Sequence, residues 1–285
     1  MNCRIWITLV LWFLGYPDQA LARSYEAITL ARETSHSFSL GFALDGAVWV
    51  HRLRREGQAT QEQAEALMAF SREQGIYLWG EATMFRGWAL SEQGQEEEGI
   101  AQIRQGLAPH PATESECVRP HFLGLLAEAC GKAGQAKEGL ALLDEALTAT
   151  YRNVGRFYEA ELYRLKGELS LQLRQVKANQ NKSEASRSIA HQNVSISEAG
   201  TVGGAHPTGE DKAEACFLKA IEIARKQQAK SLELRAVMSL SRLWQQQGKK
   251  AEARQMLAEI YGWFTEGFDT KDLQEAKTLL EELTD

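Results

Sequence analysis

The feature that most constrains the fold is a pattern of glycines and small residues that recurs at intervals of 40 residues. Gly87 and Gly94 are followed at this offset by Ala127 and Gly134, and the same step leads from Ala127 to Gly167. Recurrence at one period indicates a supersecondary unit that is repeated along the chain. A unit of this size cannot bury its apolar face alone, so the units are expected to stack on one another.

The unit is clearest in residues 80–111, where the apolar spacing predicts two amphipathic helices joined by a tight turn. Ile100 and Ile103 lie three residues apart and therefore share one face of the second helix. Gly94 lies in the break, where a residue that adopts positive φ can end the first helix. Pro111 is expected to end the unit, because proline cannot continue a helix.

This arrangement resembles the tetratricopeptide repeat, in which small residues let two paired helices approach each other and a large residue fills the space beyond. Gly99, Ile103 and Gly106 occupy the small, large and small positions of the second helix. The resemblance implies an all-α fold, a right-handed solenoid of antiparallel helix pairs. The period of 40 residues exceeds the roughly 34 of the family and implies longer helices or loops.

The pattern predicts a single helical-repeat domain over residues 1–284. Its predicted parts are a partial repeat at 5–34, helix pairs at 37–74, 80–111, 120–149, 155–228 and 231–262, and a C-terminal capping helix at 270–284. The pair at 155–228 is interrupted by an insert at 175–211, which is rich in Asn, Ser, Gln and Gly and is expected to be disordered. The capping helix has one apolar and one charged face, as the end of a solenoid requires.

A closer resemblance is carried by four stretches: LWFLGYPDQALARS (11–24), LARETSHSFSLGFAL (30–44), FRGWAL (85–90) and EIYGWFTEGFDTKDLQEAKTLLEEL (259–283). They are similar to the C-terminal repeat region of large bacterial signalling proteins. In that family an adenylate/guanylate cyclase domain and a STAND ATPase (signal-transduction ATPase with numerous domains) precede the repeats. The resemblance implies a sensor or regulatory role, with an upstream ATPase/cyclase region as a partner. The family's cyclase and phosphate-loop motifs do not occur in this sequence.

Composition limits the classes of function. Hydrophobic residues make up 44% and charged residues 25% of the chain, which is typical of a soluble globular protein. The net charge of −6 argues against nucleic acid as the main partner. The four cysteines are scattered without the spacing of a disulfide framework, which favours a reducing, cytoplasmic environment.

The amino terminus allows two interpretations. Residues 1–22 have a basic start, an apolar run of 11 residues and a small-x-small site, as in a secretory signal peptide. Alternatively, the apolar run is the end of a repeat helix, and Gly15 forms the turn after it. We favour the repeat, because the family-like stretch continues through the supposed cleavage site. This predicts a cytoplasmic protein, with export as the alternative and no membrane span, since 11 apolar residues are too few to cross a bilayer.

No catalytic, cofactor or metal site is predicted. Residues 204–211 have the glycine spacing of a phosphate loop, but Glu210 and Asp211 stand where Lys and Ser/Thr are required. Three further residues lack the spacing of known metal motifs: His110, Cys117 and His121. The sequence therefore predicts that the chain is not an enzyme.

In a stack of helix pairs, the first helix of each pair lines the concave side. The repeat frame therefore predicts a groove of exposed side chains, acidic with aromatic and methionine anchors in the middle and basic toward the C-terminal end. The candidate ligand contacts are His51, Arg54, Glu81, Met84, Trp88, His121, Glu128, Glu161, Arg164, Glu168, Arg235, Met238 and Arg242. The alternative for some of them, Met84 and Trp88 above all, is ordinary core packing.

These observations lead to three hypotheses of function. The first is a non-catalytic helical-repeat scaffold that binds a protein or peptide in the concave groove, as the sensor or regulatory region of a cyclase/ATPase signalling system. The second is a small-molecule sensor, as in related STAND regulators whose repeat domain takes an inducer. The third is an exported repeat protein.

Overall fold

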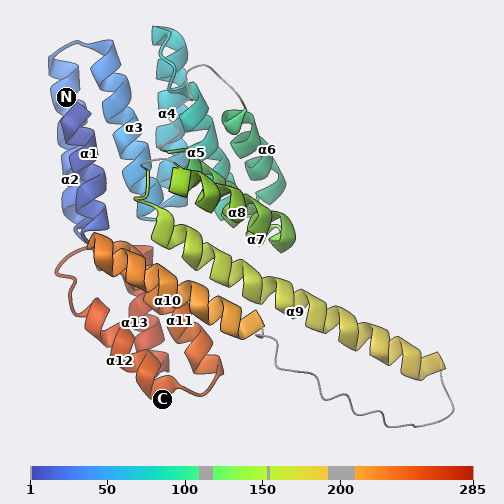
Figure 1. Ribbon diagram of the computed structural model, residues 1–285. Helices are drawn as coiled ribbons and strands as arrows, with labels where there is room; N and C mark the ends of the chain where they lie inside the picture. Colours follow the sequence, from blue (N-terminus) through green and yellow to red (C-terminus); the bar gives the residue numbers. More distant parts are fainter. Residues whose placement is uncertain (1, 109–117, 153–154, 192–208, 285) are drawn as a thin grey trace.

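The computed structural model describes residues 2–108, 118–152, 155–191 and 209–284, and within these residues it contains helices and no strands (Figure 1). The helices are α1 (Asn2–Phe13), α2 (Pro17–Glu33), α3 (Ser37–Leu53), α4 (Gly57–Gln74), α5 (Trp79–Glu92), α6 (Glu96–Leu107), α7 (Arg119–Lys132), α8 (Ala136–Arg152), α9 (Glu159–His191), α10 (Gly209–Gln227), α11 (Lys230–Gln246), α12 (Lys250–Tyr261) and α13 (Lys271–Glu282). None of them combines the length and apolarity that a membrane crossing requires.

The glycines of the repeat form the turns within the helix pairs. Gly94 has φ 81° and Gly134 has φ 75°, a region of backbone conformation that favours glycine. The residue after each glycine closes the turn: the backbone N–H of Gln95 donates to the carbonyl of Leu90 at 3.0 Å, and that of Gln135 to Cys130 at 2.8 Å. A hydrogen bond of this kind closes the C-terminus of a helix when the residue that follows the helix has a left-handed backbone conformation. It reverses the chain so that the second helix packs antiparallel to the first.

Small residues at the helix contacts allow the backbones of a pair to approach closely. A methyl group on Gly87 of α5 would lie 2.6 Å from the carbonyl oxygen of Gly99 on α6. A methyl group on Gly99 would lie 2.5 Å from the carbonyl oxygen of Gly87. The same contact recurs in the next pair, where Gly139 of α8 faces the backbone of Ala127 on α7. The predicted all-α solenoid of antiparallel helix pairs is therefore confirmed, and its steric basis is visible.

The odd-numbered helices form the inner layer. Each packs against the next odd-numbered helix, from α1 and α3 through to α11 and α13, whereas within the described residues each even-numbered helix contacts only its neighbours in sequence. In addition, α1 contacts α11, although more than 200 residues separate them (Figure 1). The superhelix therefore closes into a ring, and its inner side does not form an open groove.

The ring is held shut where the start of α2 meets the loop after α12. The carboxylate of Glu266 accepts hydrogen bonds from the backbone N–H groups of Asp18 and Gln19, both at 3.0 Å. In return, the Asp18 side chain accepts from the backbone N–H of Gly267 at 2.8 Å. A carboxylate at a helix N-terminus satisfies donors that the helix leaves free. We call these contacts between residues 18–19 and 266–267 the ring closure.

The prediction of a disordered insert that begins at 175 is wrong for its first part, because α9 continues to His191 and its end projects away from the other helices (Figure 1). Residues 175–191 contain no glycine or proline, and about half of them are Ala, Gln, Lys, Glu or Arg, which are good helix formers. Extending an existing helix avoids the nucleation cost that a separate helix would have. Residues 192–208 lie outside the described residues, as do Pro111, His110 and Cys117.

Candidate functional site

The N-terminal part of the inner layer is an aromatic core. The ring of Trp49 on α3 stacks on His121 of α7 with centroids 4.3 Å apart, and Phe85 of α5 meets Trp49 edge-on at 5.0 Å. Phe157, just before α9, contacts both rings, with its centroid 6.2 Å from that of His121 and 6.5 Å from that of Trp49. Trp49, Phe85 and His121 are all buried, so the described side chains of this part of the ring pack against one another.

His121 was predicted to be exposed in the groove, and this is wrong. Its side chain is 0% exposed, and among the described residues neither ring nitrogen has a hydrogen-bond partner. Burial, and to a smaller extent the nearby Arg52 guanidinium, lower the pKa of His121 well below its usual value. Met84 and Trp88 are buried as well, because in a closed ring the large side chains of adjacent inner helices fill the space between them.

Glu81 also lies away from an open groove. Its carboxyl group on α5 meets that of Asp45 on α3. Burial is the main cause that raises the pKa of both groups, to about 7 for Glu81 and well above the usual value for Asp45. Two carboxyl groups so placed cannot both be ionised at low cost, so near neutral pH the pair holds a proton.

His51 and Arg54 serve the ring closure. Both side chains are buried, which corrects the prediction that they are exposed. The guanidinium of Arg54 donates to Glu56 at 2.7 Å and to Asp18 at 2.9 Å, and it lies 3.3 Å from Asp269. His51 is held 2.5 Å from the Glu56 carboxylate through Nδ1. These contacts join α3 to the start of α2 and to the loop before α13.

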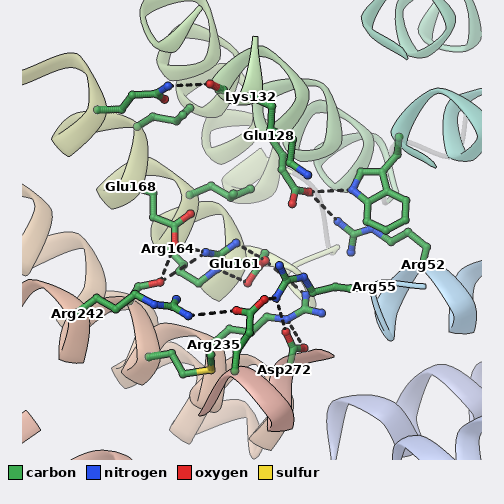
Figure 2. Close-up of a pocket in the computed structure, with 18 residues that line it drawn as sticks. Arg52, Arg55, Glu128, Lys132, Glu161, Arg164, Glu168, Arg235, Arg242 and Asp272 are labelled. Carbon is green, nitrogen blue, oxygen red and sulfur yellow. Dashed lines mark hydrogen bonds and ion pairs between the residues drawn. The ribbon is translucent and has the colours of Figure 1, made fainter. Parts of the chain in front are cut away.

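The C-terminal part of the inner layer encloses a cavity of about 290 Å³ (Figure 2). We call it the central cavity. Its walls come from α3, α5, α7, α9, α11 and α13. The lining residues are Arg52, Arg55, Trp88, Glu128, Gly131, Lys132, Glu161, Arg164, Leu165, Glu168, Leu169, Gln172, Arg235, Met238, Ser239, Arg242, Asp272 and Glu275. Most of the predicted C-terminal ligand contacts therefore meet at one site.

A chain of ion pairs crosses the cavity wall (Figure 2). Arg164 binds both oxygens of Glu161 at 2.8 and 2.9 Å, and Arg235 lies 3.5 Å from the same carboxylate. Arg235 also donates to Asp272 at 2.7 Å. It donates further to the carbonyl of Leu53 at 2.6 Å, at the C-terminal end of α3. The network thus fastens α9, α11 and α13 to α3 across the ring.

These contacts fix the charge of the buried acids. Burial alone would raise the pKa of Glu161, but the guanidinium groups of Arg164 and Arg235 outweigh it and lower this pKa to about 2. The pKa of Asp272 is lowered in the same way, against the effect of burial, by Arg235 and Arg55. The carboxylates of the network are therefore ionised at neutral pH. The prediction that Glu161 and Arg235 are exposed is wrong, since both are bound within the wall.

Arg52 lies where the aromatic core and the charged wall meet. Its guanidinium lies between the rings of Trp88 and Tyr158, 5.4 and 5.3 Å from their centroids. Nη2 is 3.5 Å from the carboxylate of Glu128, which also accepts from the Trp88 indole at 3.1 Å. Within the described residues, Nε and Nη1 of Arg52 have no hydrogen-bond partner. Stacking against aromatic rings offsets part of the cost of burying this charge.

A second, more open depression of about 460 Å³ adjoins the central cavity, and both are lined by Arg242 and Glu275. Its other lining residues include Gln245, Gln246 and Gln274, on the C-terminal end of α11 and on α13. Sequence reasoning included Arg242 but missed Arg52, Arg55, Lys132, Asp272 and Glu275. Asp272 and Glu275 could have been identified only with the knowledge that the capping helix α13 packs over the centre of the ring. Within the described residues, no group of His, Cys, Asp or Glu could hold a metal ion.

Comparisons with known proteins concern the fold alone. No protein-family model and no curated protein sequence matches the chain. Among solved structures, the apo form of RapI is 11% identical over 99% of this chain and 70% of its own, with a TM-score of 0.49. BtubC from P. vanneervenii is 11% identical over 94% and 89%, with a TM-score of 0.48. The TPR2AB domain of yeast Sti1, in its complex with pHSP90, is 11% identical over 100% and 98%, with a TM-score of 0.36. Likenesses at this level support no argument about function.

Proposed function

We propose that the chain is a non-catalytic helical-repeat scaffold for protein–protein interaction, and that it is the sensor or regulatory region of a bacterial cyclase/ATPase signalling system. The signalling context is supported by the resemblance of residues 11–24 and 259–283 to that family. These two stretches contact each other at the ring closure, so their side chains serve one structural purpose.

The observation that carries an interaction role is the outward face of α1. Trp6, Ile7 and Val10 are each about half exposed, and the apolar run from residue 5 to 14 contains no charged side chain. A cluster of exposed apolar side chains on one helix face usually marks an interaction site. Among the described residues the inner helices meet one another and do not present an open groove, so we assign α1 as the docking face and the ATPase region of the signalling system as its partner.

The test is binding between the purified chain and the separately purified ATPase region of a cyclase–ATPase protein that carries these repeats. Trp6→Glu and Val10→Glu are expected to abolish the complex in multi-angle light scattering. Leu218→Glu is the matched control, because Leu218 is an exposed apolar residue on the outer helix α10. A complex that survives both α1 variants contradicts the assignment. A dimer of the chain that Trp6→Glu splits would reassign this face to a second copy.

The central cavity favours a second candidate function, a small-molecule sensor. Its volume of about 290 Å³ is near the lower end of the roughly 300–1,000 Å³ typical of ligand pockets. It is built from helices of both halves of the ring, so a bound molecule would contact both. A metabolite that raises the melting temperature of the chain in the absence of any protein partner would support this role. Binding of the ATPase region without any such metabolite would favour the scaffold.

A further inference from the structure

We propose that the central cavity binds a small organic anion, with its carboxylate or phosphate group among the arginines and a short apolar part against the apolar lining. The inference rests on the second candidate function and deepens it, because it names the class of ligand. Three independent features of the site carry it: its charge balance, an incompletely paired buried arginine, and a loosely held arginine at its entrance.

The charge balance of the wall is positive in an acidic protein. Six cationic and five carboxylate side chains line the central cavity, whereas the whole chain carries −6. Glu92, beside the wall, pairs with Lys132 of the wall and lies 3.6 Å from Lys271, so including Glu92 and Lys271 adds one charge of each sign and leaves the surplus unchanged. Nearby cations lower the pKa of the buried acids Glu128, Glu161 and Asp272 against the effect of burial, so these three carboxylates already count as negative charges. A partly enclosed site with excess positive charge attracts an anion.

Arg52 is the cation that the wall neutralises least. It is only 2% exposed, its one carboxylate contact within the described residues is 3.5 Å long, and Glu128 shares that carboxylate with Trp88. By contrast, the other deep arginines, Arg164 and Arg235, each have several short bonds. A buried charge without full compensation is costly. An anionic group in the central cavity would supply negative charge at short range without displacing Glu128.

Arg242 is the cation that an entering ligand meets. It lies on the boundary between the central cavity and the outer depression, and its side chain is 44% exposed (Figure 2). Its one described ion pair is to Glu275, at 3.1 Å. Exposed pairs of this kind are weak, so Arg242 can exchange Glu275 for an anion at little cost.

The lining also contains an apolar strip. This strip favours an organic anion over an inorganic ion as the ligand. Trp88, Leu165, Leu169 and Met238 lie beside the charged groups in the same wall. A ligand with a short hydrocarbon or ring portion would cover this strip while its anionic group remains among the arginines. A cationic ligand is disfavoured, because the acids Glu161 and Asp272 already each bind two guanidinium groups.

The test uses the full chain and matched pairs of probes: benzoate and benzamide, hexanoate and hexanamide, glycerol phosphate and glycerol. Thermal shift and calorimetry at constant ionic strength are expected to show binding of an anion without binding of its neutral counterpart. Arg242→Gln should weaken that binding by about 10–100-fold, the usual effect of losing a charge-assisted hydrogen bond. Arg242→Lys should restore part of it. Arg254→Gln, on the exposed surface of α12, should leave it unchanged.

The outcomes separate this inference from the function on which it rests. If the neutral probes bind as tightly as the anions, the proposal of an anionic ligand is wrong and the sensor role remains. Anion binding that Arg242→Gln leaves intact would overturn the site. If no probe binds but a wider screen finds a neutral metabolite, the ligand class is wrong and the sensor survives. If no small molecule binds in either screen, both are wrong.

Discussion

The two parts of the inner layer occupy equivalent positions in the ring and are built from opposite chemistry. Around His121, the helices α3, α5 and α7 meet through aromatic rings in stacked and edge-on contacts. Around Glu161, the helices α9, α11 and α13 meet through ion pairs and leave the central cavity. Flat rings fill space, whereas arginine and glutamate side chains must keep their charged ends paired and so pack less densely. The repeat fixes where inner side chains lie, and their chemistry decides whether a cavity forms.

The largest expected effect tests the charged part. Glu161→Gln leaves Arg164 and Arg235 buried without their shared carboxylate and should destabilise the protein by about 3–5 kcal/mol, measured by urea unfolding. Because the folded-state pKa of Glu161 is lowered to about 2, its contribution is complete above its unfolded pKa and is lost as the pH falls toward 2. The variant should therefore show a shallower acid dependence in that range. Glu281→Gln, exposed on α13, is the control; equal effects would contradict the network's role.

The aromatic part should respond to pH in a different window. The pKa of His121 is lowered in the folded state, so protonation of the unfolded chain removes stability as the pH falls below about 6.5. His121→Phe keeps the stacking and removes the titration. Between pH 7 and 5 the wild type should lose about 2 kcal/mol more than the variant. His36→Phe, outside the aromatic core, is the comparison; if it flattens the profile as much as His121→Phe, the aromatic core is not the cause.

An effect of similar size and opposite sign is expected for Glu81. Its pKa is raised to about 7, so the neutral form is favoured on folding and stability is lost as the pH rises through 7. Glu81→Gln should therefore make the protein about 2 kcal/mol more stable at pH 8 relative to pH 5, compared with wild type. Thermal melts at the two pH values measure this difference. A profile that Glu81→Gln leaves unchanged would mean that the Asp45–Glu81 pair does not hold a proton.

The smallest effect belongs to the entrance. Arg242→Gln breaks one partly exposed pair and should change the free energy of unfolding by less than about 1 kcal/mol. This value sharpens the comparison with Glu161, since both residues belong to the same cavity wall. A loss as large as that of Glu161→Gln would place Arg242 among the groups that hold the ring together and would remove it from the entrance role.

Much of this architecture could be predicted from local sequence, and the ring could not. Gly87 and Gly94 reveal a close helix pair and its turn, because glycine requirements are local. The frame also placed Glu161, Arg164 and Arg235 on inner helices. Their burial depends on contacts between residues more than 180 positions apart, such as Arg235 with Leu53 and Asp18 with Gly267. Such contacts arise from the accumulated rotation of many units, which no single unit encodes.

The ring closure has a mechanical consequence. Because Glu266 binds the N-terminus of α2, the first and last helix pairs are tied together, and the spacing between them is set by the same ring that encloses the cavity. A molecule that widened this ring would strain the tie, and one that drew the helices inward would tighten it. A ligand bound at the centre would thereby displace the first and the last helix pairs together.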